Sequence, residues 1–256
     1  MAREKIADRF ERWPAISEEY RHQVQRTLTG MSSGNLLENC FYSFKSAAEV
    51  FAIESYFIKN DLAEAKNWFY VSALASMVAM ERYGKDELSF SRPFDFALLS
   101  DSKELQARIA RWRYPEMEAR LAKRMFMASN IRITQHLLLN EDEKAIEVFN
   151  AFLPNAGKKD YAILAADIRF LDGMVFRERA KVEEAIHQLL EKKMVRYRNK
   201  DSIPGIGEWL SHPAMWYAKL AWIKGMEIEI DHPLVPMALL PVAPLPEYKS
   251  PWPFLA

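Results

Sequence analysis

This sequence has little cysteine, little glycine and no excess of charge of either sign. Cys40 is the single cysteine among 256 residues, so no disulfide can form within the chain. It lies between Leu37 and Phe41 on an apolar stripe, where a free cysteine behaves as a small buried hydrophobic residue. Lysine plus arginine number 35, as do aspartate plus glutamate, so the formal net charge is zero. Because nucleic-acid-binding proteins usually carry a basic excess or a basic face, this balance argues against direct binding of nucleic acid.

The sequence pattern also shows neither a signal peptide nor a membrane-spanning helix. The first nine residues mix charges of both signs before any apolar run, unlike a signal peptide. The most apolar window, 214–223, is about ten residues long and contains Lys219. A helix needs about 20 apolar residues to cross a bilayer. We therefore predict a cytoplasmic protein without membrane contact.

The sequence does contain enough apolar material for one core. Half of the residues are apolar and 27% are charged, a composition typical of folded rather than disordered chains. A chain of 256 residues lies near the upper size of a single domain. We therefore predict one α-helical domain over residues 1–256. Seven of the thirteen prolines fall between Pro233 and Pro253, and residues 242–256 are predicted to form a proline-rich tail.

Apolar residues recur every three or four positions along most of the chain, which is the pattern of helices with one buried face. Polar breaks separate these stripes, and Asp61 and Asp101 are each predicted to cap the helix that follows. A loop is predicted at 89–100. The expected helices are a short one near the amino terminus, 35–59, 61–82, a short one after 101, 115–139, 143–153, 161–171, 182–199 and 211–224.

Neighbouring helices joined by short polar breaks form antiparallel hairpins. Such breaks occur at Asn60-Asp61, at 140–143 and near Gly173. We therefore predict an all-α fold of stacked antiparallel helix hairpins. It resembles the tetratricopeptide arrangement, although no clean repeat of about 34 residues is present. The predicted helix at 211–224 is apolar nearly all round, so it should be buried on most sides.

A short extended segment follows that last helix. Residues 226–231 alternate strictly between apolar and acidic, a period of two that is typical of extended backbone. Ile228 and Ile230 are then predicted to point inward. The acidic residues on the opposite face are Glu227, Glu229 and Asp231. Three interpretations remain open for them: solvated charges that prevent edge-to-edge aggregation, an acidic patch for a basic partner, or a metal site.

The sharpest enzyme hypothesis comes from the histidines. On a helix, a glutamate three residues before a histidine shares its face, and two such pairs with two further glutamates build a di-iron site. Three of the five histidines have this spacing, in the pairs Glu19 and His22, Glu184 and His187, and Glu229 and His232. The third pair falls in the extended segment and the first in a short terminal helix, so the pattern of a di-iron enzyme is incomplete.

Other catalytic signatures do not occur in the sequence. A helical ribonuclease built on a spaced Arg and His motif would need a longer spacing than that between Arg132 and His136. A Gly-rich phosphate loop, a Gly-x-Ser-x-Gly elbow and a His-Glu-x-x-His motif are missing. We therefore predict a protein that is not an enzyme, with no catalytic residue, no metal and no cofactor.

Basic residues cluster in three runs along the helices. Solvated helix faces account for such runs, and the last run also suits the carboxyl end of a helix. A nucleic-acid surface would require the runs to merge on one side, with aromatic residues between them for stacking. The runs are Arg108, Arg111 and Arg113; Arg120, Lys123 and Arg124; and Lys192, Lys193, Arg196, Arg198 and Lys200.

Several blocks in the second half of the chain carry a family resemblance. They are Asn140-Glu-Asp-Glu-Lys-Ala-Ile-Glu-Val-Phe149, Lys158-Lys-Asp-Tyr-Ala-Ile-Leu-Ala-Ala-Asp-Ile168, a helix near 178–193, Ser211-His-Pro-Ala-Met-Trp-Tyr-Ala-Lys-Leu-Ala-Trp-Ile-Lys-Gly225 and Asp231-His-Pro-Leu-Val-Pro-Met-Ala-Leu-Leu240. Together these blocks resemble the bacterial immunity protein 49 family. The resemblance covers roughly residues 140–240, and the closing blocks are its most telling part.

The resemblance implies a mostly helical protein encoded beside a polymorphic toxin. Such a protein binds and neutralises its cognate toxin, often a nuclease-type effector, in the producing cell. Because a nuclease groove is basic, carboxylates that mimic phosphate are the predicted toxin-binding residues. The first choice is Glu227, Glu229 and Asp231, and the second is Glu141, Asp142 and Glu143. The rival interpretations are the di-iron enzyme and a tetratricopeptide-like scaffold that binds a peptide.

Overall fold

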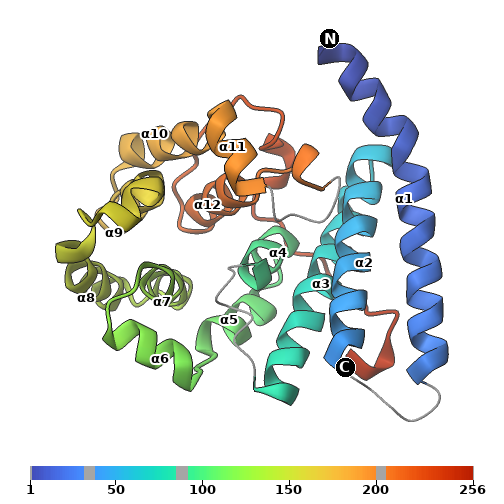
Figure 1. Cartoon of the computed structure of the whole chain (residues 1–256), viewed down its shortest axis with the longest axis horizontal. Coiled ribbons are helices and arrows are strands. Elements are labelled where there is room, and N and C mark those ends of the chain that lie inside the picture. Colours follow the sequence, from blue (N-terminus) through green and yellow to red (C-terminus); the bar gives the residue numbers. More distant parts are fainter. Residues whose placement is uncertain (1, 32–37, 85–91, 200–205, 256) are drawn as a thin grey trace.

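The protein is an assembly of α-helices in which no strand occurs within the described residues, so the predicted all-α class is confirmed. The computed structural model describes residues 2–31, 38–84, 92–199 and 206–255. Three helices stand side by side at the amino-terminal end, and later helices form an arc on the other side of a central group (Figure 1). The α-helices are α1 Ala2–Met31, α2 Glu38–Ile53, α3 Leu62–Tyr83, α4 Arg92–Ser100, α5 Lys103–Arg111, α6 Pro115–Ala122, α7 Phe126–Leu138, α8 Asp142–Phe152, α9 Ala165–Val175, α10 Arg179–Leu190, α11 Lys192–Arg198 and α12 His212–Ile223.

Short helical turns complete the secondary structure. A π-helical turn, η1, Glu54–Ile58, extends α2. The 3-10 turns are η3 Leu153–Asn155, η4 Lys159–Leu164, η6 Ile206–Glu208, η7 Met237–Leu239 and η8 Pro253–Leu255. None of the described helices is both long and apolar enough to span a membrane.

The predicted hairpin at 35–82 is confirmed as α2 and α3, which pack against each other. Asp61 caps α3 as expected, because its side chain accepts a hydrogen bond of 2.8 Å from the Glu64 backbone N–H. Gly84 ends the helix with a positive φ of 62°, a conformation that favours glycine. Residues 35–37, predicted to begin the first helix, lie outside the described residues.

Two long helices predicted as continuous are each broken in the structure. The predicted helix 115–139 is divided into α6 and α7, because Arg124 takes a left-handed φ of 54° between them. The predicted helix 182–199 is divided into α10 and α11 at Glu191, whose ψ of 136° is extended. Neither break contains glycine or proline, so no local signal marks it.

Two predictions in the amino-terminal half were wrong. The amino-terminal helix α1 is 30 residues long rather than short. Residues 92–100, predicted as part of a loop, form α4. Its residues from Phe94 to Ser100 are all buried, so it lacks the exposed side that gives a helical period.

The break predicted near Gly173 lies at 176–178, so Gly173 itself is inside α9, where α10 packs closely. A Cβ atom at this position would come within 2.8 Å of Val182 Cγ2 and 2.9 Å of the Val182 backbone nitrogen. The missing side chain therefore sets how closely α9 and α10 approach.

The hydrophobic core is one continuous cluster that extends from α2 and α3 to α9 and α10, and α12 lies in it. Residues 214–221 of this helix are all buried, as its apolar sequence predicts. Among them is Lys219, whose side chain is fully buried beside Asp101. Asp101 does not cap α5, because Ser102 fills that place and its hydroxyl accepts the hydrogen bond of Leu105 N–H at 3.3 Å.

The segment after α12 is extended and the tail packs on the body. Ile228 and Ile230 are buried at 0% and 1% exposure, which confirms the predicted inward direction. In the tail, Trp252 lies against Phe44 with ring centroids 4.6 Å apart, and Leu255 is buried. The specific likeness to a tetratricopeptide stack, and the division into one domain, stay predictions.

Candidate functional site

The first-choice acidic residues lie on an extended segment that is tied to α12. Gly225 has a φ of 76° and lets the chain turn away from the helix end. The indole N–H of Trp222 then donates a hydrogen bond of 2.9 Å to the Ile228 carbonyl. With Ile228 and Ile230 buried, alternate side chains face solvent. We call the exposed residues Glu227, Glu229 and Asp231 the acidic ledge.

An arginine from α10 faces this acidic ledge. Arg179 bonds first to Glu183, with Nε 2.7 Å from the carboxylate. That bond is the main cause of the raised pKa of Arg179, and the charges of Glu229 and Glu227 raise it further. The ledge is therefore acidic on its exposed side and partly balanced where it meets α10.

Two of the predicted glutamate and histidine pairs meet at the edge of α10. Burial lowers the pKa of His232, and the charge of His187 lowers it further while Asp231 opposes the shift. Glu184, however, forms an ion pair with Arg169 of α9. Within the described parts of the chain, no group of three or more His, Cys, Asp and Glu side chains comes together to hold a metal ion.

The first residue of the second-choice set is already engaged within the protein. Glu141 Oε2 lies 2.6 Å from His136 Nδ1, and its other oxygen lies 2.9 Å from Lys144 Nζ. The contacts with Lys144 and His136 lower the pKa of Glu141. Glu143 is exposed at the start of α8.

Asp142 ties three parts of the fold together. Its Oδ2 lies 2.7 Å from Arg177 Nη2 in the α9–α10 turn, and its Oδ1 lies 3.0 Å from Lys224 Nζ at the end of α12. Arg177 also donates a 2.8 Å hydrogen bond to the Lys224 carbonyl. Burial opposes ionisation of Asp142, but Lys224 and Arg177 outweigh it and lower the pKa. This carboxylate therefore joins three chain segments.

The two predicted sets lie on one side of the molecule. Arg177, which binds Asp142, is two residues from Arg179, which faces the ledge. Lys224, which also binds Asp142, is three residues from Glu227 of the ledge. The Cα atoms of each of these two pairs therefore lie within about 11 Å of each other. The surface around the acidic ledge therefore alternates in charge instead of being uniformly negative.

The basic runs are engaged in different places. Arg108 is paired with Glu81 of α3, and Arg198 with Asp167 of α9. In Figure 1 the first two runs lie at α5 and α6, below the centre of the view, whereas α11, which carries the third, lies in its upper part. Lys200, the last residue of the third run, lies outside the described residues.

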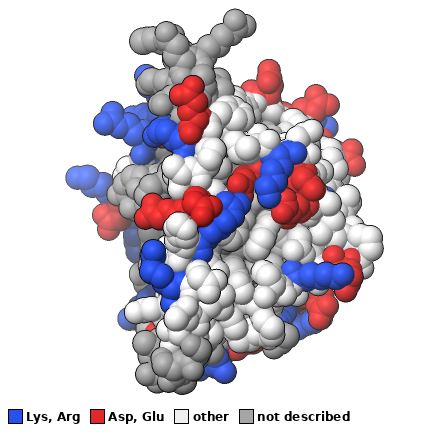
Figure 2. Space-filling view, turned by 90° about the vertical axis from the view of Figure 1, so that its right-hand side faces the viewer, with Lys and Arg blue, Asp and Glu red and all other residues white. Residues whose placement is uncertain are grey.

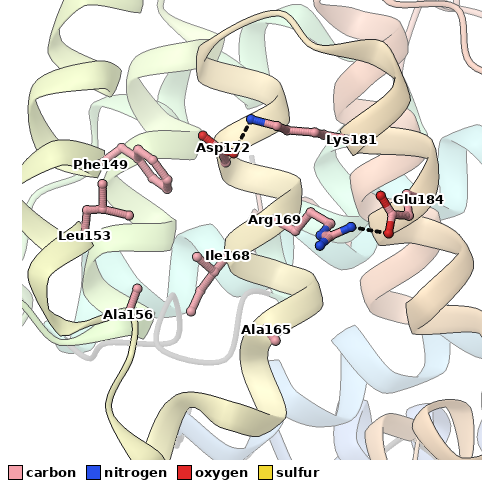
Figure 3. A pocket seen from close by; sticks show the side chains of 9 residues that line it. All are labelled: Phe149, Leu153, Ala156, Ala165, Ile168, Arg169, Asp172, Lys181 and Glu184. Atoms are coloured by element: carbon pink, nitrogen blue, oxygen red, sulfur yellow. Dashed lines mark hydrogen bonds and ion pairs between the residues drawn. The ribbon is translucent and has the colours of Figure 1, made fainter.

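A groove that the sequence analysis missed lies between α8, α9 and α10. It encloses about 580 Å³, and Figure 3 shows apolar side chains on the α8 side and charged ones from α9 and α10. Four of its apolar members, Phe149, Leu153, Ala165 and Ile168, follow the helical stripes, so their periodicity gave no sign that part of the stripe is open. The lining residues are Phe149, Leu153, Ala156, Ala165, Ile168, Arg169, Asp172, Lys181 and Glu184.

Comparison with known proteins gives one family match. The model of the family described as immunity protein 49 matches residues 59–239. This range runs from the end of η1 through η7 and contains the acidic ledge, the Asp142 contacts and the groove. It begins well before the region near 140 where the sequence blocks were recognised. No curated protein and no solved structure matches the chain. Since the match covers more than half of the sequence, the chain belongs to the immunity protein 49 family.

Proposed function

We propose that this protein binds the toxin made by the same cell and neutralises it by covering the toxin's functional surface. The observation that carries the proposal is the family match over residues 59–239, because immunity families belong to toxin systems. Membership suggests a role without catalysis, and steric cover needs none. A stable protein complex buries about 1,600 Å² in total, which helical faces and connecting segments of this size can provide.

The acidic ledge supports a basic partner such as a nuclease-type toxin domain. Its three carboxylates are exposed, and the buried side chains of Ile228 and Ile230 that alternate with them hold the segment in place, so the carboxylates need no rearrangement to meet cations. Complementary charge of this kind speeds encounter more than it raises affinity. Glu141 and Asp142 are weaker candidates, because each would have to leave cations of its own chain.

The test uses the toxin domain encoded next to the gene of this chain. Producing that domain alone in a bacterial host should stop growth, and producing it together with this protein should restore growth. Purified together, the two should form a complex that survives gel filtration. As a control, an unrelated toxin should remain lethal. If growth stays arrested although the protein is folded and abundant, and no complex forms, the proposed function is wrong.

A further inference from the structure

Exposed apolar side chains gather around the groove between α8 and α9. Nine large apolar side chains are exposed in the described residues, and two of them lie at this groove. Leu153, 48% exposed, lines the groove. Phe176, 45% exposed, packs edge-on against Phe149 with ring centroids 6.1 Å apart. Clusters of this kind on a surface mark interaction sites.

The charges at the rim of the groove neutralise one another. Arg169 is paired with Glu184, and Lys181 Nζ lies 2.7 Å from Asp172 Oδ2, as the dashed lines of Figure 3 indicate. Two cations and two carboxylates leave the lining without net charge. A charged group entering the groove would have to break one of these pairs, so charge complementarity favours an uncharged occupant.

The groove and the acidic ledge flank the same helix. From α10, Lys181 and Glu184 reach the groove, whereas Arg179 faces the ledge. A helix with its side chains is about 10–12 Å wide, so one interface of standard size can cover both features. Interfaces commonly place an apolar anchor at the centre and charged residues at the rim.

A second groove, formed by α1, α2, η1, α3 and the tail, fits this role less well. It belongs to the half of the molecule that carries α1, and on the face shown in Figure 2 basic and acidic side chains are interspersed. The Arg21 guanidinium already lies over the Phe51 ring, 5.3 Å from its centroid, and pairs with Glu54 at 2.6 Å. Residues of α1 and of the tail lie outside the family match, whereas the α8–α9 groove lies entirely within it.

We propose that the α8–α9 groove receives an uncharged apolar side chain from a loop or helix of the toxin, as the central anchor of the complex. This inference rests on the proposed function and names the part of the surface that carries the affinity. The anchor displaces water from the wall formed by Phe149, Leu153 and Ile168. The acidic ledge contributes at the rim.

The experiment compares three variants against the neighbouring-gene toxin domain by calorimetry. Leu153→Asp places a charge at the exposed wall, and Ala165→Trp fills the groove with bulk. Ile58→Asp is the control, since Ile58 is also exposed, at 37%, but lies on η1 away from the groove. Both groove variants should raise the dissociation constant by about 30-fold or more, the effect of losing a hot-spot contact. The dissociation constant of the control should stay within about threefold of that of the unmodified protein.

The outcomes separate this inference from the proposed function. Thermal unfolding first shows that both groove variants are folded. If the unmodified protein neutralises the toxin and both variants bind it as tightly as the control does, the groove inference is overturned and the proposed function stands. If the unmodified protein does not bind the toxin, both fall. Leu153→Met, which keeps the side chain apolar and of similar size, should retain binding and serves as the conservative check.

Discussion

Lys219 Nζ lies 2.7 Å from Asp101 Oδ1, and both side chains are fully buried. The second oxygen of Asp101 lies 2.7 Å from Lys66 Nζ, so one carboxylate serves two lysines. Lys219 also donates to three successive carbonyls at 2.9–3.0 Å, those of Leu239, Leu240 and Pro241. Lys66 donates to the Ala243 carbonyl at 2.9 Å. The interior charges therefore bind the backbone of residues 239–243, the stretch that leads into the tail.

Asp101→Asn should destabilise the protein more than Lys219→Met. The first change leaves two buried ammonium groups without their counter-charge, which typically costs about 3–5 kcal/mol. The second leaves Lys66 and Asp101 as a balanced pair and loses mainly the bonds to carbonyls. Asparagine also tolerates the left-handed φ of 62° at this position, so backbone strain does not confound the comparison. Chemical denaturation measures both free energies, and the reverse order would contradict this account.

The stability difference between the unmodified protein and Lys219→Met should change with alkaline pH. Burial lowers the pKa of Lys219 from 10.5 to about 8, although Asp101 opposes the shift. Between these values the unfolded chain holds a proton that the folded chain has released, so the unfolding free energy of the unmodified protein rises with pH. Below pH 8 both states are protonated and this gain disappears. Between about pH 7 and about pH 11, the unfolding free energy of the unmodified protein should rise relative to that of Lys219→Met by on the order of 3 kcal/mol. Chemical denaturation at several pH values measures it, and a difference that does not change with pH would mean that the pKa of Lys219 is not lowered.

Gly173→Ala should destabilise the protein although alanine favours helices. The new Cβ would meet the Val182 backbone nitrogen at 2.9 Å, and backbone cannot move aside as a flexible side chain can. Overpacking of this kind costs about 1–3 kcal/mol, and relief would also separate α9 from α10. The gain in helix propensity is at most about 1 kcal/mol. Gly157→Ala is the control, because a Cβ atom added there would meet nothing within 4 Å. Equal melting temperatures for the two variants would show that the helices adjust freely.

Local patterns in the sequence made several elements predictable. The helices α2 and α3 and the cap at Asp61 were predicted from neighbours in the sequence, and each is found, although residues 47–53 of α2 and 71–77 of α3 are buried all round and not along one stripe. The alternation after Gly225 likewise predicted which side chains of the extended segment are buried. In each case the signal and its cause lie within a few residues of each other.

Features that depend on distant partners could not be predicted in this way. Asp101 resembles a helix cap in sequence, but its partners Lys66 and Lys219 lie far from it along the chain. Asp142 was selected for its charge, whereas Arg177 and Lys224 make it a structural tie. Phe149, Leu153, Ala165 and Ile168 share the helical stripes of the core, and only the packing of α8 against α9 determines that part of a stripe stays open.

Reversing the three charges of the acidic ledge should slow binding of a basic toxin. The triple variant Glu227→Lys, Glu229→Lys and Asp231→Lys changes exposed side chains, so its stability should be nearly unchanged. Steering by charge changes association rates by about 10-fold or more at low salt, and salt should reduce the difference. Stopped-flow mixing with the toxin domain measures the rate at two ionic strengths.

Asp142→Asn makes the contrasting case for the same surface. Asp142 holds Arg177 and Lys224 rather than facing outward alone, so its loss should lower the unfolding free energy while leaving the association rate almost unchanged. If the triple variant instead binds the toxin as fast and as tightly as the unmodified protein, the ledge lies outside the interface. In that event the affinity must come from apolar contacts, and the case for a basic, nuclease-type partner loses its only structural support.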